Sequence, residues 1–380
     1  MHKINLNIPN ITNLEKKYVN DVIKSKWLSS NGKHTIIFEK KFSKFIGVKN
    51  SIAVQSGTAA LHVAMKGIGV KNGDKVIIPN FTCNSNISSV SQCNAIPVVV
   101  EIENDTLGLD FEEVKKAIKK YKPKALQLVH IYGFPCRDTK KIISYCKKKN
   151  VIVVEDASEA LGAKISKKFV GSFGDVSVFS VRSEKMIGVG EGGIVLSNNK
   201  IFFDKIKTIA SRNSPFRNAK DPYWKKYFTN GEGYNYLMPH LLGAVGRGQI
   251  ERFKKDILIK KIKVGLYYRE IFKDRRIVFS QIKKDNSSPV YWLNSVHFPT
   301  LKISEIRSLA NYLEKNGVEI RPGFWPLNKL NYKIFYQGNK ANTEYMFKSS
   351  IILPSNYLIK RKEIKFIYDL IIKYLNDKKL

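Results

Sequence analysis

The chain has 380 residues, of which 43% are hydrophobic and 11% aromatic, and this composition excludes a disordered protein. Its 66 Lys and Arg residues against 32 Asp and Glu residues give a formal net charge of +34, which attracts anions such as nucleic acids, membrane surfaces or phosphorylated metabolites. Because the lysines are scattered and form no dense tract, the charge alone selects none of these partners.

The chain has no apolar run of membrane-spanning length, and its first residues lack the apolar core of a signal peptide. Its four cysteines form no C-x-x-C pair and have no histidine cluster nearby, which favours reduced thiols and predicts neither disulfides nor a metal site. We therefore expect a soluble, cytoplasmic protein that does not bind a membrane. The absence of a helix-turn-helix or RNA-binding signature also argues against a nucleic-acid binder.

Two helices are predicted at the start of the chain. Thr12 and Glu15 form a capping box, and Tyr18 and Val22 lie on one face of the helix that follows. A second helix carries three phenylalanines between residues 38 and 45 and ends at Gly47.

Short β-rich runs then alternate with helical patterns. Strands are predicted at residues 51–54, 75–78, 96–100, 125–130, 151–155, 177–181 and 193–196. Helices are predicted near residues 58–67, 111–121 and 138–149. This alternation predicts an α/β fold with a mostly parallel sheet covered by helices on both faces.

The pattern changes beyond about residue 240. A long helical stretch at 241–273 precedes a helix from Ser304 to Gly317, a strand at 318–320 and an amphipathic helix at 362–375. We therefore expect a large domain at 1–240, followed at 241–380 by a linking helix and a smaller α/β domain.

The first candidate binding motif is the turn at residues 56–61, directly after the first strand of the sheet. Gly57 allows close approach of the backbone, Thr58 supplies a hydroxyl, and the helix N-terminus presents free N–H groups to an anion. The turn is either a phosphate site or an ordinary strand-to-helix connection.

A second candidate is Asp156, which with Glu155 ends an apolar strand. A carboxylate at the end of a buried strand needs a cationic or hydrogen-bonding partner, and a pyridinium nitrogen would be one. Because Asp156 and Glu159 also fit a capping box, the alternative is a helix cap.

A third motif combines Ser180, at the end of a strand, with Lys185 and a glycine-rich turn at residues 188–193. An amine in a desolvated site can form a Schiff base, whereas a surface lysine without function is the alternative. Further along the chain, Asn235 is either a phosphate ligand or a turn residue.

In this order, the motifs resemble the DegT/DnrJ/EryC1/StrS family of sugar aminotransferases within the fold-type I enzymes that use pyridoxal 5′-phosphate (PLP). The resemblance rests on residues 27–32, 56–61, 79–82, 130–133, 155–159, 185–193, 233–238, 317–327 and 353–355. It therefore covers nearly the whole chain and implies a PLP transferase fold with a large and a small domain.

The resemblance also implies roles for individual residues. Lys185 would be the Schiff-base lysine and proton shuttle, and Asp156 the partner of the pyridine nitrogen. Cofactor contacts are further implied for Gly57, Thr58, Cys83, Glu159, Ser180 and Asn235. Asn235 would reach the phosphate of the neighbouring subunit, which makes an obligate homodimer. Substrate contacts are implied for Ser29, Asn31 and Arg321.

Glu159, the motif at 27–32 and the segment at 321–327 are most similar to the perosamine-synthase branch of the family. That branch transfers the amino group of glutamate, through the pyridoxamine form of the cofactor, to a nucleotide-linked 4-keto-6-deoxy sugar for bacterial surface glycans such as lipopolysaccharide O-antigen or capsule. The chain departs from the family pattern at Cys83, where an aromatic residue is usual, and at Leu237, where an arginine is usual.

These two departures keep other acceptors and functions open. One alternative is an aminotransferase for a smaller phosphorylated ketone, and another is a PLP-binding regulatory protein of the same fold. A sugar dehydratase is disfavoured because some relatives with that activity have histidine where this chain has Lys185.

Overall fold

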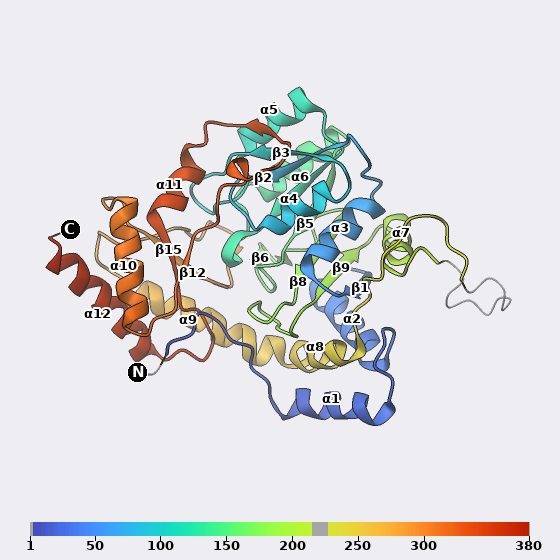
Figure 1. Ribbon diagram of the computed structural model, residues 1–380, viewed down its shortest axis with the longest axis horizontal. Helices are drawn as coiled ribbons and strands as arrows, with labels where there is room; N and C mark the ends of the chain where they lie inside the picture. Colours follow the sequence, from blue (N-terminus) through green and yellow to red (C-terminus); the bar gives the residue numbers. More distant parts are fainter. Residues whose placement is uncertain (1–2, 215–226, 380) are drawn as a thin grey trace.

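A computed structural model describes residues 3–214 and 227–379. Within them, the centre of the molecule is an eight-stranded sheet with the strand order β1-β9-β8-β5-β4-β2-β3-β14. Its strands are β1 (Asn50–Val54), β2 (Lys75–Pro79), β3 (Ile96–Val100), β4 (Ala125–Val129), β5 (Ile152–Asp156), β8 (Val176–Ser180), β9 (Gly193–Ser197) and β14 (Phe335–Gln337). β9 pairs antiparallel with β1 and β8, whereas the other neighbouring pairs are parallel (Figure 1).

Helices cover both faces of this sheet, because alternate residues of its apolar strands point to opposite sides. On one face, side chains such as Val76 and Ile78 pack with α3 (Gly57–Gly67), α4 (Asn84–Ser91) and α7 (Lys200–Ala210). On the other face, Ile77 and its neighbours pack with α5 (Phe111–Tyr121) and α6 (Thr139–Lys148).

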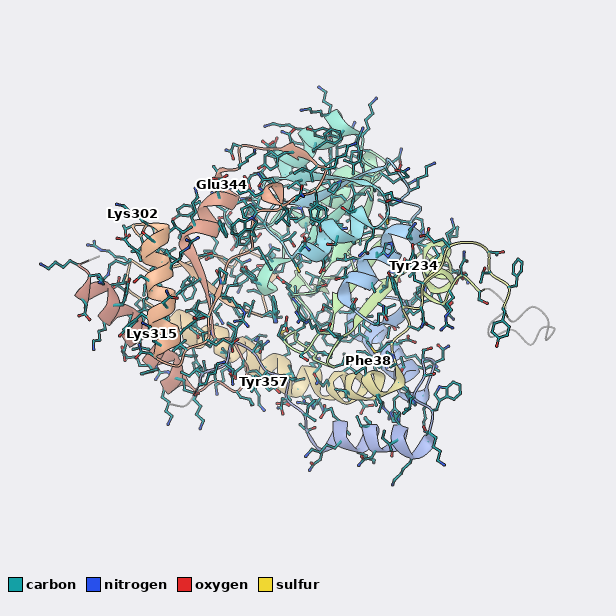
Figure 2. The ribbon with its side chains drawn as sticks, in the orientation of Figure 1. Phe38, Tyr234, Lys302, Lys315, Glu344 and Tyr357 are labelled. Atoms are coloured by element: carbon teal, nitrogen blue, oxygen red, sulfur yellow. The ribbon has the colours of Figure 1, made fainter. Side chains whose placement is uncertain are left out.

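The N-terminal helices are α1 (Asn13–Ser25) and α2 (Lys33–Ile46), and both contact α8 (His240–Arg252). Phe38, labelled in Figure 2, is fully buried on α2 and belongs to the same core as Phe179 of β8. α8 continues through one π-helical turn (Phe253–Ile257) into α9 (Leu258–Ile271). Figure 1 shows this long helical segment leading from the large sheet to the C-terminal part of the chain.

The C-terminal part contains a four-stranded antiparallel sheet within the described residues, with the order β10-β12-β15-β13. These strands are β10 (Val278–Phe279), β12 (Asn294–His297), β15 (Ser350–Leu353) and β13 (Arg321–Pro322). The helices beside them are α10 (Ile303–Lys315), α11 (Ala341–Ser349) and α12 (Arg361–Asp377). In Figure 2, Lys302 and Lys315 mark the two ends of α10.

Short elements complete the fold. β11 (Ser287–Ser288), β6 (Lys164–Ile165) and β7 (Lys168–Phe169) form a small third sheet in the described chain. Three-residue 3-10 turns lie at Ile131–Gly133 and Leu327–Lys329.

The strands predicted between residues 51 and 196 are confirmed to within one residue at each end. The N-terminal capping box and the helix that ends at Gly47 are also confirmed. The predicted strand at 318–320 is wrong, because there Val318 makes only an isolated bridge with Ile4, and the short strand β13 begins at Arg321. The N-terminal segment pairs with too few residues there to form a strand.

The chain returns to the large sheet late in the sequence. β14, at residues 335–337, pairs in parallel with β3 and so adds a strand from the C-terminal part to the central sheet. The division at residue 240 stays a prediction. Among the helices of the described residues, none combines the length and the apolar character needed to cross a membrane.

Candidate active site

A cavity of about 240 Å³ lies at the carboxyl ends of β5 and β8, beside the N-terminus of α3. Ligands of open parallel sheets commonly bind at this edge. The cavity is lined by seven of the residues that the sequence singles out: Gly57, Thr58, Cys83, Asp156, Glu159, Ser180 and Lys185. Residues from 57 to 185 therefore converge on one site.

The wall formed by α3 is an anion-binding turn. Ser56 caps the helix, and its Oγ accepts a hydrogen bond from Ala59 N at 3.0 Å. The N–H groups of Gly57 and Thr58 donate to no other described residue, so they are free for an anion. A Cβ placed on Gly57 would lie 3.1 Å from Ser180 Oγ, so the turn lies against the Ser180 side chain, and both line the cavity.

Asp156 is held in a defined orientation at the end of β5. It is 4% exposed, its Oδ1 accepts from Ser158 N at 3.0 Å, and its Oδ2 accepts from Asn86 Nδ2 at 2.9 Å. Residues 157–163 form turns and not a helix, so the helix-cap alternative is wrong. The carboxylate instead belongs to the lining of the cavity.

Lys185 lies between a carboxylate and an aromatic ring. Its Nζ is 3.1 Å from Glu159 Oε1 and 3.6 Å from the centre of the Trp292 ring. Glu159 Oε2 accepts from Tyr132 N at 2.9 Å. Burial raises the pKa of Glu159, and the nearby ammonium of Lys185 opposes this shift. The surface-lysine alternative is therefore wrong, since only 12% of the Lys185 side chain is exposed.

Hydrogen bonds from three other parts of the chain hold the turn that carries Lys185. Gln249 of α8 binds both backbone groups of Gly188, at 2.9 Å to its nitrogen and 2.7 Å to its oxygen. Trp292 Nε1 donates to the carbonyl of Glu184 at 2.7 Å, and Asn7 Nδ2 donates to the same carbonyl. These contacts bring the N-terminal and C-terminal parts of the chain to the lysine.

Several lining residues were not identified from the sequence. Arg182 pairs with Glu191 at 2.9 Å and with Glu184 at 3.1 Å, at the rim of the cavity. Asn86 lines the cavity beside Asp156, and besides its bond to Asp156 it donates to Gln127 Oε1 at 2.8 Å. The signal for this contact is Gln127 itself, because a polar residue inside an apolar strand needs a buried partner.

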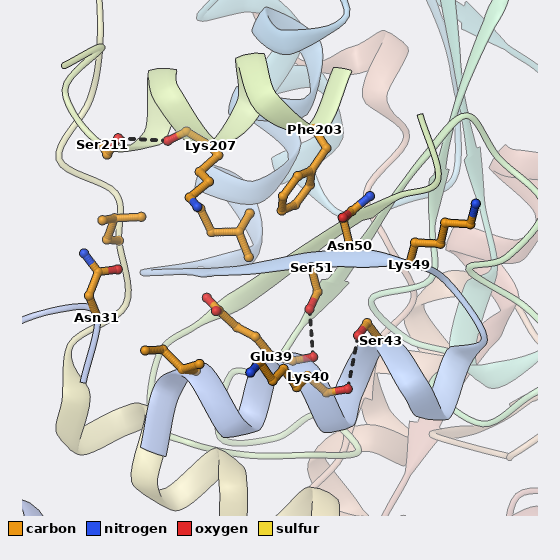
Figure 3. A pocket seen from close by; sticks show the side chains of 13 residues that line it. Asn31, Glu39, Lys40, Ser43, Lys49, Asn50, Ser51, Phe203, Lys207 and Ser211 are labelled. Carbon is orange, nitrogen blue, oxygen red and sulfur yellow. Dashed lines mark hydrogen bonds between the residues drawn. The ribbon is translucent and has the colours of Figure 1, made fainter. Parts of the chain in front are cut away.

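The other predicted site residues lie outside this cavity. Ser29 and Asn235 are exposed, and Arg321 is exposed and pairs with Glu319 at 2.8 Å. Asn31 lines a second cavity, of about 460 Å³, between α2, β1 and α7 (Figure 3). In this second cavity, burial raises the pKa of Glu39 to about 7. The roles of Ser29, Asn31, Asn235 and Arg321 stay predictions.

The family model that matches this chain is that of the DegT/DnrJ/EryC1/StrS aminotransferases, over residues 9–371. The chain belongs to this family. This aminotransferase is 36% identical to the GDP-perosamine synthase of Vibrio cholerae, over 97% of its own length and 98% of that relative. It is 32% identical to the enzyme of the same name from Escherichia coli O157:H7, over 97% and 98% of the two chains.

Solved structures share its fold. Helicobacter pylori PseC, an aminotransferase of pseudaminic acid biosynthesis, matches with a TM-score of 0.90 at 22% identity, covering 99% of this aminotransferase and all of PseC. The E. coli GDP-4-keto-6-deoxy-D-mannose-3-dehydratase with bound hydrated PLP matches with a TM-score of 0.88 at 22% identity, over 97% and 100% of the two chains. At these identities the likeness shows the fold alone.

This aminotransferase depends on PLP. The cavity fits that cofactor, because a turn with free N–H groups, a fixed carboxylate and a largely buried lysine line the same space. They match the phosphate, the ring nitrogen and the aldehyde of PLP, respectively.

Proposed function

We propose that this aminotransferase moves the amino group of glutamate to the keto group of a nucleotide-linked 4-keto-6-deoxy sugar, for the synthesis of a bacterial surface glycan. The relatives named GDP-perosamine synthase, at 31–36% identity, support this acceptor class. The observation that carries the proposal is the convergence of Lys185, Asp156 and the turn at Gly57 on one cavity.

The residues of the cavity divide the work between them. Gly57, Thr58 and Ser180 would hold the phosphate of PLP, and Asp156 would keep a proton on its ring nitrogen. When bound, PLP stabilises the electron pair left behind as the α C–H bond of the amino donor breaks. Lys185 Nζ would hold the cofactor before glutamate binds. It would then take the α-proton of glutamate and give it to a carbon of the cofactor.

Glu159 would act on Lys185. Its carboxylate lies 3.1 Å from Lys185 Nζ, so it can receive or release a proton as the amine changes state. The ring of Trp292 on the other side limits the positions that the amine can take. Both contacts would keep Nζ directed into the cavity.

We further propose that the active enzyme is a homodimer in which the partner subunit completes the cavity. Asn235, Ser29 and Asn31 are exposed or lie away from the cavity of their own chain. A second copy could bring them to the neighbouring cavity, whose rim at Arg182 is also exposed. Arg321 is also exposed, and we propose it as a substrate contact because the resemblance to the family implies one.

A smaller phosphorylated ketone as the acceptor is the alternative that Cys83 suggests, and the named relatives do not favour it. Cys83 lines the cavity where the family pattern has an aromatic residue, and a thiol offers less area for stacking. A panel of keto sugars and small phosphorylated ketones, tested against the pyridoxamine form of the enzyme, would distinguish the two acceptor classes.

The test of the proposed chemistry is Lys185→Ala. The variant should lose the visible absorbance of the lysine-bound cofactor and at least about a thousand-fold of the rate of 2-oxoglutarate formation from glutamate, because the amine that moves the proton is gone. Lys200→Ala is the control, since the side chain of Lys200 is 80% exposed on α7. Unchanged spectra and turnover in Lys185→Ala would contradict the assignment.

A further inference from the structure

A chain of four buried polar side chains is hydrogen-bonded to the carboxylate of Asp156 through Asn86. Asn86 and Ser89 come from α4, Gln127 comes from the middle of β4, and Thr82 precedes α4. Each of the four is at most 3% exposed. Buried polar groups of this kind lower stability unless they bond to one another, so their geometry carries information.

The direction of each hydrogen bond in this chain follows from its far end. The backbone carbonyl of Asn86 can only accept, so the hydroxyl of Ser89 donates to it, at 2.9 Å. With its single proton used, Ser89 Oγ must accept from Gln127, at 3.0 Å from Nε2. The amide of Gln127 therefore turns its oxygen, and not its nitrogen, toward Asn86.

The same logic determines the side-chain amide of Asn86. Because Gln127 Oε1 accepts, Asn86 must present Nδ2 to it, at 2.8 Å, and the second proton of Nδ2 points to Asp156 Oδ2 at 2.9 Å. Thr82 Oγ1 donates to Asn86 Oδ1 at 2.8 Å, which agrees with this orientation. The opposite orientation would place the amide oxygen against the carboxylate, where the two would repel each other.

We propose that Asn86 is a positioning residue for the cofactor, and that Gln127 and Ser89 determine which way its amide faces. This inference rests on the proposed role of Asp156. A donor from Asn86 on Oδ2 and one from Ser158 on Oδ1 keep both oxygens as acceptors and fix the plane of the carboxylate. Asp156 is thereby ready to bind a protonated ring nitrogen without reorganising.

The test uses Asn86→Leu, which removes the donor while leaving a side chain of similar size. We expect PLP to bind about ten- to a hundred-fold more weakly, the range for loss of one hydrogen bond to a charged group. The pH midpoint of the visible absorbance of the bound cofactor should also rise. If Asp156 binds the ring nitrogen of the cofactor more weakly, that nitrogen carries less positive charge. Because this charge disfavours protonation of the bond between Lys185 and the cofactor, its loss should raise the pKa of that bond.

Asn86→Asp should behave differently. When protonated, the new carboxyl group can still donate to Asp156, whereas its ionised form repels Asp156. The affinity for PLP should therefore fall more steeply with rising pH than in the unmodified enzyme. A simple packing defect would not produce this pH dependence.

The control is Asn356→Leu, because Asn356 is also buried and its Nδ2 donates to Asn5 O at 2.8 Å, outside the cavity. It should lower the melting temperature without moving the pH midpoint. An unchanged midpoint and PLP affinity in Asn86→Leu, with Lys185→Ala behaving as predicted, would overturn the inference and leave the proposed function intact. If Asn86→Leu does not fold, Gln127→Met replaces it as the test, because it removes the oxygen that orients the Asn86 amide. This variant should raise the pH midpoint by a smaller amount. An unchanged midpoint would overturn the inference.

Discussion

At the scale of the residue, Glu159 and Lys185 are two titratable groups in direct contact. The proposed reaction requires each of them in more than one protonation state. The Glu159 side chain is 7% exposed and that of Lys185 12% exposed, so water screens their interaction poorly. Burial raises the pKa of Glu159, the ammonium of Lys185 lowers it, and the net direction is upward. The folded chain therefore holds a proton on this carboxyl group more strongly than the unfolded chain does.

This shift has a consequence for the stability of the cofactor-free protein. Since the folded pKa of Glu159 lies above its ordinary value of 4.5, its contribution to stability decreases as the pH rises from 4.5 through the folded pKa. Glu159→Gln removes this decrease. The melting temperature of the variant minus that of the unmodified protein should become more positive between pH 4.5 and neutral pH.

Glu344→Gln is a matched control, because the contact with Lys329 lowers the pKa of Glu344. Its contribution to stability is lost only below about 4.5, so its difference in melting temperature should stay constant over the same window. A difference for Glu159→Gln that is flat or turns negative over that window would contradict the assigned direction.

The residues that the sequence could identify are those whose chemistry is visible in a local motif. Lys185 is followed by its glycine-rich turn, Asp156 ends an apolar strand, and Gly57 opens a helix, and all three line the cavity. Asn86 and Arg182 have no such local pattern. Their contacts to Asp156 and Glu191 arise only when the sheet brings the strand ends together.

At the scale of the element, the turn between β8 and β9 is built so that its backbone packs against itself. Gly190 has φ +107°, which disfavours any residue with a Cβ, and a Cβ on Gly188 would lie 2.3 Å from the carbonyl oxygen of Ser183. The turn can therefore close tightly enough to place Lys185, five residues after Ser180, in the cavity.

Gly188→Ala tests this packing. The added methyl group meets backbone atoms, which cannot move aside as a flexible side chain could, so we expect a loss of about 1–3 kcal/mol in unfolding free energy. PLP affinity should fall by at least about ten-fold, because the displaced turn carries Lys185. Both are measured on purified protein, by denaturant unfolding and by cofactor titration.

Gly73→Ala is the control, because it strains the backbone without pushing a neighbouring segment aside. Gly73 has φ +79° and open space where its Cβ would lie, so alanine there should cost about 1–2 kcal/mol through backbone conformation alone. PLP affinity should not change in this control. Equal losses of PLP affinity in the two variants would mean that the turn does not position the lysine.

The elements themselves were largely predictable, because strands such as β3 and β4 are apolar runs bounded by turn residues. The exceptions are strands that form only by pairing with segments far away in the sequence. β14 is a three-residue strand whose partner β3 lies more than 200 residues earlier, and the short β13 exists only because it pairs with β15. Local periodicity cannot predict strands that are defined by such contacts.

At the scale of the whole molecule, one surface carries both apolar residues and the predicted contacts to a partner. Trp27 and Leu28 are 55% and 49% exposed, and they directly precede Ser29 and Asn31. Asn31 and Ser211 line one cavity, and Ser211 forms a β-bridge with Asn235. These exposed apolar residues lie beside predicted site residues that are outside the cavity of their own chain. Such a surface fits an interface with a second copy of the chain.

Mixed dimers test whether Asn235 serves its own chain or its partner. Asn235→Ala and Lys185→Ala should each have low activity alone. If Asn235 acts on the partner, a dimer that combines the two variants would supply the site with intact Lys185 with Asn235 from the Lys185→Ala subunit. About half of the sites should then work. The other site lacks both groups.

The activity of such heterodimers, isolated with two different affinity tags, therefore distinguishes the two arrangements. If Asn235 acted on the cavity of its own chain, each site in the mixed dimer would lack one required group, and activity would stay at the level of the separate variants. Recovery to about half of the unmodified rate requires the asparagine to cross between subunits, because no other pairing of these variants yields a complete site.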